Sequence, residues 1–276
     1  DLGETCLVAK TDPITFATEE IGWYAVQVAA NDLATTGADP RWLLLTALLP
    51  EGKSTAQLAT QIADQVRQAC LPLGISVIGG HTEVTSGLDR PILSVTLLGT
   101  CAKDQLILPT GIRAGDDILL TKSIALEGSA ILAREFQGQL VSSFSPEELR
   151  QASNFIFTPG IGVSADARAA LAAGQVNAMH DPTEGGLAAA LNEMAAAGAV
   201  KLTVRADAVP IHPLSKRLCA FFGLDPWATI SSGALLIACP PEESSKIVAG
   251  LAAAEIAAAR IGQASPGRGV DIIEDA

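Results

Sequence analysis

Asp32 stands on the apolar stripe of a predicted helix, where a carboxylate is unexpected. At about 100° per residue, it lies within roughly 60° of Ile21, Ala25 and Val28 on the helix surface. Burial of an unpaired charge is costly, and this helix offers no Lys or Arg one turn away to compensate. A cation held jointly with other carboxylates would supply the missing positive charge. The alternative is that Asp32 lies at the end of the helix and caps a neighbouring loop.

Two further aspartates stand where predicted elements end or begin. Asp12 follows a predicted strand and precedes a proline, a combination that is also common in ordinary turns. Open α/β sheets place ligands at the carboxyl ends of strands, which favours a functional interpretation. Asp181 is followed by Pro182 and Glu184 in the pattern of a helix N-cap. Together, Asp12, Asp32 and Asp181 are our candidate metal ligands.

Two glycine pairs could bring bare backbone close to an anion. Gly185 and Gly186 fall where a helix should gain its first turns, and each costs about 1 kcal/mol relative to alanine. We therefore expect an alanine at either position to leave the helix at least as stable. A helix N-terminus without side chains can hold a phosphate, and the nearby Asp181 would then require a divalent cation. The segment 79–82, Gly-Gly-His-Thr, follows a predicted strand and predicts a second anion-binding turn.

The histidines and cysteines carry weaker signals. His180 is interpreted as a contact at the entry of a helix, and His212 as a solvated loop residue before Pro213. The cysteines are odd in number and lack C-x-x-C spacing, which favours buried thiols in a reducing compartment over disulfides or a zinc site. They are Cys6, Cys70, Cys101, Cys219 and Cys239.

The bulk composition excludes several classes of protein. The 276 residues are 49% apolar and 17% charged, which is enough for a sizeable core and favours two domains. The formal net charge is −12 with scattered Lys and Arg, so no basic stripe is available for nucleic acid. The apolar runs are far shorter than the roughly 20 residues of a membrane span. We therefore expect a cytoplasmic protein with neither nucleic acid nor membrane as a partner.

Strands and helices alternate on both sides of a loop-rich break. The segment 109–117 is rich in Gly, Pro and Asp and predicts a domain boundary. Before it, we predict strands at 5–10, 42–49, 75–78 and 91–99, and helices at 19–36 and 55–71. After it, we predict strands at 118–121, 202–205, 234–238 and 257–261, and helices at 164–173, 183–197 and 244–253. This alternation indicates an α/β class.

Five segments occur in the order and spacing of a known superfamily. They are TDPITF (11–16), ANDLATTGADP (30–40), IGGHTEV (78–84), GDDILLTK (115–122) and MHDPTEGGLAAALNE (179–193). Over nearly the whole chain, these segments resemble the aminoimidazole ribonucleotide (AIR) synthase superfamily of PurM-like proteins. The HDPT-GGL segment is most similar to the HypE-like and AIR synthase-related groups.

The resemblance implies a two-domain α/β (α+β) PurM-like fold. It implies an N-terminal ATP-binding and dimerisation domain at 1–109, whose start is missing from this sequence, and a C-terminal α/β domain at 110–276. The N-terminal strands would form a β-barrel shared between the subunits of a homodimer. ATP and Mg²⁺ would be the cofactors, with Asp12, Asp32 and Asp181 on the metal. The nucleotide would be approached by Asn31, Asp32, Gly79, Gly80, His81, Thr82, Gly185 and Gly186.

Three functions stay open at this point. The first is an ATP- and Mg²⁺-dependent enzyme that phosphorylates or activates a small-molecule or peptide-end acceptor, through charge stabilisation on the transferring phosphoryl. The second is a HypE-like maturation or assembly factor that binds nucleotide and a protein partner with little turnover. The third is a metal-dependent phosphohydrolase, which would release phosphate from simple esters without ATP.

Overall fold

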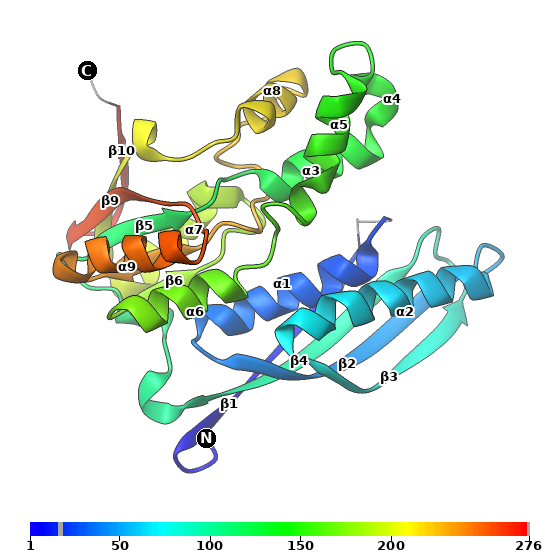
Figure 1. Cartoon of the computed structure of the whole chain (residues 1–276), viewed down its shortest axis with the longest axis horizontal. Coiled ribbons are helices and arrows are strands. Elements are labelled where there is room, and N and C mark those ends of the chain that lie inside the picture. Colours follow the sequence, from blue (N-terminus) through cyan, green and yellow to red (C-terminus); the bar gives the residue numbers. More distant parts are fainter. Residues whose placement is uncertain (16–18, 275–276) are drawn as a thin grey trace. The chain divides into compact units, whose positions relative to one another are not determined.

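The chain consists of two compact units, each with its own sheet (Figure 1). A computed structural model describes residues 1–15 and 19–274. The units are Asp1–Leu106 and Ile107–Ala276. Phe16, the last residue of the TDPITF segment, lies outside the described residues. Within the described ranges, no helix has the length and apolar character that would let it cross a membrane.

The first unit is a mixed sheet with the strand order β1-β4-β2-β3. Its strands are β1 (Thr5–Ile14), β2 (Asp39–Pro50), β3 (Ser76–Thr85) and β4 (Ile92–Ala102). Its helices are α1 (Ile21–Thr35) and α2 (Ala56–Cys70). β2 and β3 are parallel and are joined by α2, as a parallel pair requires a crossover, whereas β4 runs antiparallel to β1 and β2.

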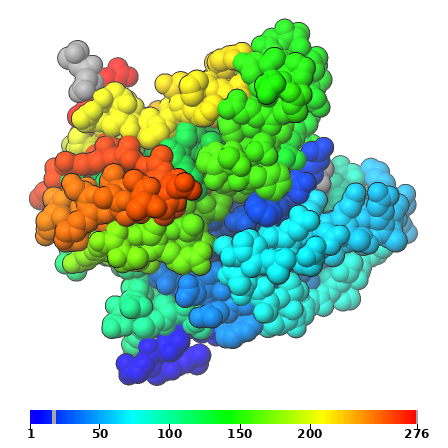
Figure 2. All heavy atoms as spheres, in the orientation of Figure 1, coloured from blue at the N-terminus to red at the C-terminus, as the bar shows by residue number. Residues whose placement is uncertain are grey.

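Both helices of the first unit lie on the same face of its sheet (Figure 1). In β4, alternate residues point to that face, and Leu93, Val95 and Leu97 are fully buried there. The two helices pack closely because Gly22 of α1 has no side chain: a Cβ there would lie 2.8 Å from the carbonyl oxygen of Ile62. In the space-filling view, α2 (cyan) forms the outer layer on this side of the first unit (Figure 2).

Two strands of the first unit extend beyond their predicted ends. β1 continues through Asp12, which pairs with Val95 of β4, so Asp12 does not follow a strand end as we expected. Pro13 is tolerated there because β1 is an edge strand of this sheet. The predicted turn at 79–82 is also wrong, because these residues lie inside β3 and pair with residues 44–47 of β2.

A bulge in β3 explains its glycine pair. Leu43 pairs with Val77 and Leu44 pairs with Gly79, so the strand carries one extra residue at this point. At Gly80 the φ angle is +153°, and a Cβ would lie 2.0 Å from the carbonyl oxygen of Leu45. The glycine at position 80 is therefore required by the close approach of two strands.

Replacement of Gly80 by alanine is expected to lower the stability of the first unit by about 2–4 kcal/mol, because strand β3 must move away from β2. The matched control is Gly79→Ala, since a Cβ at position 79 meets only Leu44 Cδ2 at an ordinary 3.6 Å. Urea unfolding of the two variants measures the difference. Equal stabilities would contradict this account of the bulge.

The second unit has the strand order β10-β7-β9-β5-β8-β6. Its strands are β5 (Asp117–Thr121), β6 (Ala178–His180), β7 (Val200–Arg205), β8 (Leu236–Cys239), β9 (Ala258–Pro266) and β10 (Gly269–Ile273). Its helices are α3 (Leu126–Glu135), α4 (Gln137–Leu140), α5 (Pro146–Ser153), α6 (Ser164–Ala173), α7 (Gly186–Gly198), α8 (Pro213–Phe221) and α9 (Pro241–Ala253). β10 and β7 are parallel, and every other neighbouring pair is antiparallel.

Different helices are buried against the two faces of this second sheet. Ile118 and Leu120 of β5 belong to one apolar cluster with Leu187 and Leu191 of α7. Thr121, at the end of β5, contacts α6 instead. α6 and α9 (orange) lie side by side at the surface of the unit (Figure 2). The second unit therefore buries both faces of its sheet, one against α7 and the other against α6 and α9.

Candidate functional site

Two of the predicted metal ligands meet at one cationic side chain in the first unit. Lys10 and Asp12 are alternate residues of β1, so both side chains point towards α1. Asp32 reaches the same place from the last turn of α1. The Lys10 ammonium lies 3.0 Å from a carboxylate oxygen of Asp12 and 3.1 Å from one of Asp32. The structure therefore groups Asp12 and Asp32 as predicted, but around a lysine.

The electrostatics of this cluster leave it short of positive charge. Burial raises the pKa of Asp32 to about 6; the charge of Lys10 lowers it and the neighbouring Asp12 raises it. Burial lowers the pKa of Lys10, but its bonds and charge interactions with the two aspartates outweigh burial and raise it overall. Two carboxylates share one ammonium, so Lys10 compensates Asp32 incompletely.

Lys10 is the group that the sequence analysis missed. The helix of Asp32 offers no partner one turn away, and the partner lies on a strand 22 residues earlier. The available signal was the alternation of Lys10 and Asp12 in a strand with no other charged residue, which places opposite charges on one face.

The other predicted nucleotide contacts of the first unit lie in different environments. Asn31 is fully buried within α1, whereas His81 and Thr82 are exposed on β3. The His81 ring nitrogen Nε2 lies 3.2 Å from a carboxylate oxygen of Glu83, the next residue on the same face. Contact of these residues with a nucleotide stays a prediction.

The start of α7 differs from the predicted helix entry. The helix begins at Gly186, so Asp181 is not its N-cap, and Gly185 and Gly186 both have left-handed backbone conformations (φ +78° and +62°). A Cβ at Gly186 would lie 2.4 Å from the carbonyl oxygen of Trp227. The backbone N–H of Ala188 donates to that same oxygen at 3.0 Å. The glycine pair therefore has a packing role, and its predicted contact with a phosphate is untested.

Asp181 is buried in the second unit, between β6 and α7. Its approach to Asp12 and Asp32 of the first unit stays a prediction. The neighbouring His180 places Nε2 2.8 Å from a carboxylate oxygen of Glu193, which lies in the middle of α7 and not at the predicted helix entry.

His212 is not a solvated loop residue, contrary to the prediction. Its Nδ1 accepts a hydrogen bond from the backbone N–H of Leu214 and so caps α8. Its ring also packs edge-on against Phe155, with centroids 4.8 Å apart. Burial lowers the pKa of His212, which favours the neutral ring that capping requires.

Glu127 is a buried acid that the sequence analysis did not single out. It lies in the first turn of α3, is 1% exposed and accepts a hydrogen bond from the backbone N–H of Ser232 at 3.2 Å. Burial raises the pKa of Glu127 to about 7; hydrogen bonds from Ser232 oppose this, and the charge of Glu184 adds to it. The second unit therefore contains a carboxyl group that titrates near neutral pH.

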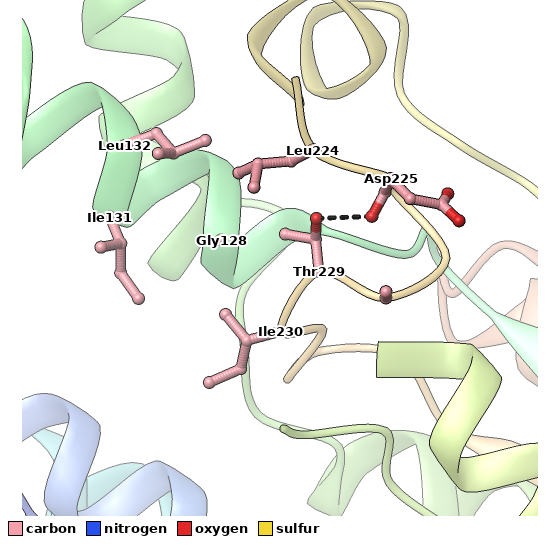
Figure 3. Close-up of a pocket in the computed structure, with 8 residues that line it drawn as sticks. Gly128, Ile131, Leu132, Leu224, Asp225, Thr229 and Ile230 are labelled. Atoms are coloured by element: carbon pink, nitrogen blue, oxygen red, sulfur yellow. Dashed lines mark hydrogen bonds between the residues drawn. The ribbon is translucent and has the colours of Figure 1, made fainter. Parts of the chain in front are cut away.

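An apolar cavity of about 280 Å³ opens in the second unit between α3 and the segment 224–230 (Figure 3). The Thr229 hydroxyl donates to the backbone carbonyl of Asp225 at 2.8 Å, and apolar side chains form most of the wall. The lining residues are Gly128, Ile131, Leu132, Leu224, Asp225, Ala228, Thr229 and Ile230. None of the predicted site residues lines this cavity.

Asp12 and Asp32 suit a hard divalent cation that is shared with a ligand. Within residues 1–15 and 19–274, no group of three or more His, Cys, Asp or Glu side chains could hold a metal ion by itself. Proteins commonly bind Mg²⁺ through one or two carboxylates, with waters and substrate phosphates completing the coordination. The pair therefore fits Mg²⁺ bound together with phosphate, rather than an all-protein metal cage.

Comparison with known proteins places both units in one family. Residues 1–101 match the N-terminal domain, and residues 113–275 the C-terminal domain, of the AIR synthase related protein family. A Methanocaldococcus jannaschii protein, provisionally named for hydrogenase expression and formation, is 32% identical over 238 residues. That alignment covers 85% of this chain and 66% of the relative. The carbamoyl dehydratase HypE of Rhizobium leguminosarum is 29% identical, with 87% and 66% covered.

This chain spans about two thirds of the length of these curated relatives. The hydrogenase maturation protein HypE, solved in complex with ATP, superposes with a TM-score of 0.79 at 26% identity, covering 98% of this chain and 82% of that one. The expected two-domain α/β PurM-like fold is thereby confirmed. On its sequence and its fold, the chain belongs to the AIR synthase related family.

Proposed function

We propose that the chain is an ATP- and Mg²⁺-dependent enzyme that phosphorylates or activates a small-molecule or peptide-end acceptor. The observation that carries this proposal is that Asp12 and Asp32 converge on one positive charge, the Lys10 ammonium, at 3.0 and 3.1 Å. The ATP complex of the 26% identical HypE supports ATP as the nucleotide. A phosphoryl acceptor is not defined by any residue of the site.

The chain's own residues divide into two roles in this proposal. Asp12 and Asp32 hold the metal, which supplies positive charge to the phosphates when it is bound. Asp181 is proposed as a third carboxylate near the same ion. The remaining predicted nucleotide contacts position the phosphates through their backbone and side chains. They are Asn31, Gly79, Gly80, His81, Thr82, Gly185 and Gly186.

A second copy of the chain is the proposed neighbour of the first unit's uncovered sheet face. The side chains on that face include exposed apolar groups, among them Leu7, Trp42 and Leu44 at 42%, 40% and 37% exposure. Apolar side chains this exposed on a regular sheet are typical of an interaction surface. The homodimer implied by the family resemblance would cover them.

Titration calorimetry with ATP and Mg²⁺ tests the proposed function. The Asp32→Asn variant keeps the size of the side chain and removes its charge, so we expect at least about a tenfold loss of affinity. Asp64→Asn is the matched control, since Asp64 lies exposed on α2 and pairs with Arg67 at 3.5 Å. Binding of Mg²⁺–ATP to Asp32→Asn at the wild-type affinity would contradict the proposal.

A HypE-like maturation factor is the second candidate, and the names of the curated relatives favour it. Such a factor would bind nucleotide and a protein partner with little turnover. An ATPase assay separates the two candidates, because acceptor-stimulated turnover is expected only of the enzyme.

A further inference from the structure

Lys10 occupies the position between the two carboxylates where the proposed metal would bind. We infer that Lys10 is an internal counter-ion that weakens binding of the free metal and strengthens binding of the metal–nucleotide complex. The inference rests on the proposed function and adds a residue with two opposite effects. It predicts that one substitution changes the two affinities in opposite directions.

The ammonium and a divalent cation compete for the same oxygens. Lys10 Nζ lies 3.0 Å from Asp12 and 3.1 Å from Asp32, so both carboxylates are engaged. Mg²⁺ needs such oxygens at about 2.0–2.1 Å in near-octahedral geometry. Two positive charges at that spacing repel each other strongly, so the ammonium must withdraw before the metal binds.

The side chain of Lys10 can withdraw without moving its strand. The backbone of Lys10 is fixed by pairing with Leu97 of β4. Its side chain is 35% exposed, so part of it borders solvent. A lysine stem has four flexible carbons, and its head can leave one partner for another while the stem stays packed.

The charge balance gives the withdrawn ammonium a second role. Two carboxylates and one ammonium carry a net charge of about −1, which a divalent cation changes to about +1 if the lysine stays nearby. Without the lysine, the occupied site would be neutral and would attract a polyphosphate less. Between the two carboxylates the ammonium opposes the bare metal, whereas after displacement to a nearby position its charge favours the nucleotide.

The test measures Mn²⁺ binding alone and Mg²⁺–ATP binding for the 276-residue chain and its Lys10→Met variant. Methionine keeps an unbranched stem and removes the charge. We expect Mn²⁺ to bind about tenfold more tightly to Lys10→Met and Mg²⁺–ATP to bind several-fold more weakly. Lys10→Gln provides a second variant if Lys10→Met does not fold, and Lys10→Arg should keep the wild-type pattern.

Lys103→Met is the matched control, because Lys103 forms an exposed pair with Asp1 at 2.7 Å and should change neither affinity. Mn²⁺ binding that depends on Asp32 but is no tighter in Lys10→Met and Lys10→Gln would overturn this inference alone. Unchanged or tighter Mg²⁺–ATP binding in these variants would overturn it as well. Absence of Asp32-dependent Mn²⁺ binding in every protein would overturn the proposed metal site together with the inference.

Discussion

Replacement of Asp166 by alanine is expected to lower the free energy of unfolding of the second unit by about 3–5 kcal/mol. Asp166 lies in α6 with its side chain 3% exposed, and the Lys122 side chain beside it is 8% exposed. The Lys122 ammonium donates to Asp166 at 3.1 Å and to the carbonyl of Gly162 at 2.7 Å. The Thr121 hydroxyl donates to the other carboxylate oxygen at 2.6 Å. Alanine would leave a buried ammonium without its counter-charge and a buried hydroxyl without its acceptor.

The pKa of Lys122 agrees with the direction of this effect. Burial lowers it, and the charge of Asp166 opposes that lowering, so the ammonium form depends on Asp166. Urea titration monitored by hydrogen exchange of the β5 amides reports on the second unit alone.

A double variant separates the lost charge pair from lost packing. Asp166→Asn combined with Lys122→Met removes both charges and keeps an oxygen that accepts from Thr121. We expect it to recover most of the stability that Asp166→Ala loses, because no buried charge is left over. A loss below about 1 kcal/mol in Asp166→Ala, or a double variant no more stable than the single one, would contradict this account.

Where the information is local, the sequence predicts the elements well. The helix predicted at 55–71 is confirmed as Ala56–Cys70, because Thr55 caps it by accepting from the backbone N–H of Leu58. The apolar run at 118–121 is confirmed as the buried strand β5. Such elements have their caps, helix breakers and periodicity within a few residues, so their type and bounds depend little on tertiary packing.

The second part of β3, beyond the strand predicted at 75–78, shows why other stretches could not be predicted. Nearly the whole strand is exposed, with Val77, Ile78 and Val84 each more than half accessible, so it lacks the alternation of a half-buried strand. The glycines at 79 and 80 then favoured a turn. Only pairing with β2 keeps this segment extended, and pairing between distant residues leaves no local signal.

The candidate site was predicted in part, for the same reason. The apolar stripe of α1 correctly indicated that Asp32 lies on the side of the helix that packs beside β1, where partial burial raises the pKa of its carboxyl group. The identity of the compensating cation depends on the packing of α1 beside β1, which brings Lys10 to Asp32. Spacing along one helix reveals a charge that needs a partner, but it does not reveal a partner on another element.

Replacement of Gly186 by alanine is expected to destabilise the second unit by about 2–5 kcal/mol. Helix propensity alone predicts the opposite, a helix at least as stable as that of the wild type. Two costs add: about 1–2 kcal/mol for a side chain at a left-handed φ of +62°, and about 1–3 kcal/mol for overpacking. The overpacking arises because the new Cβ would lie 2.4 Å from the carbonyl oxygen of Trp227 and 2.6 Å from that of Thr229. Both are backbone atoms, so they can move only with their whole loop.

Gly223→Ala is the control that isolates the first cost. Gly223 has a similar φ of +67°, but nothing lies within 4 Å of the position that its Cβ would take. We therefore expect only about 1–2 kcal/mol of destabilisation there. Hydrogen exchange of α7 and of the 227–229 loop during urea titration measures the stability of both variants. Equal losses of stability in the two variants would show that the loop moves easily to accommodate the new Cβ of Gly186→Ala. A more stable α7 in Gly186→Ala would contradict the packing role and would favour an open helix N-terminus, as an anion site requires.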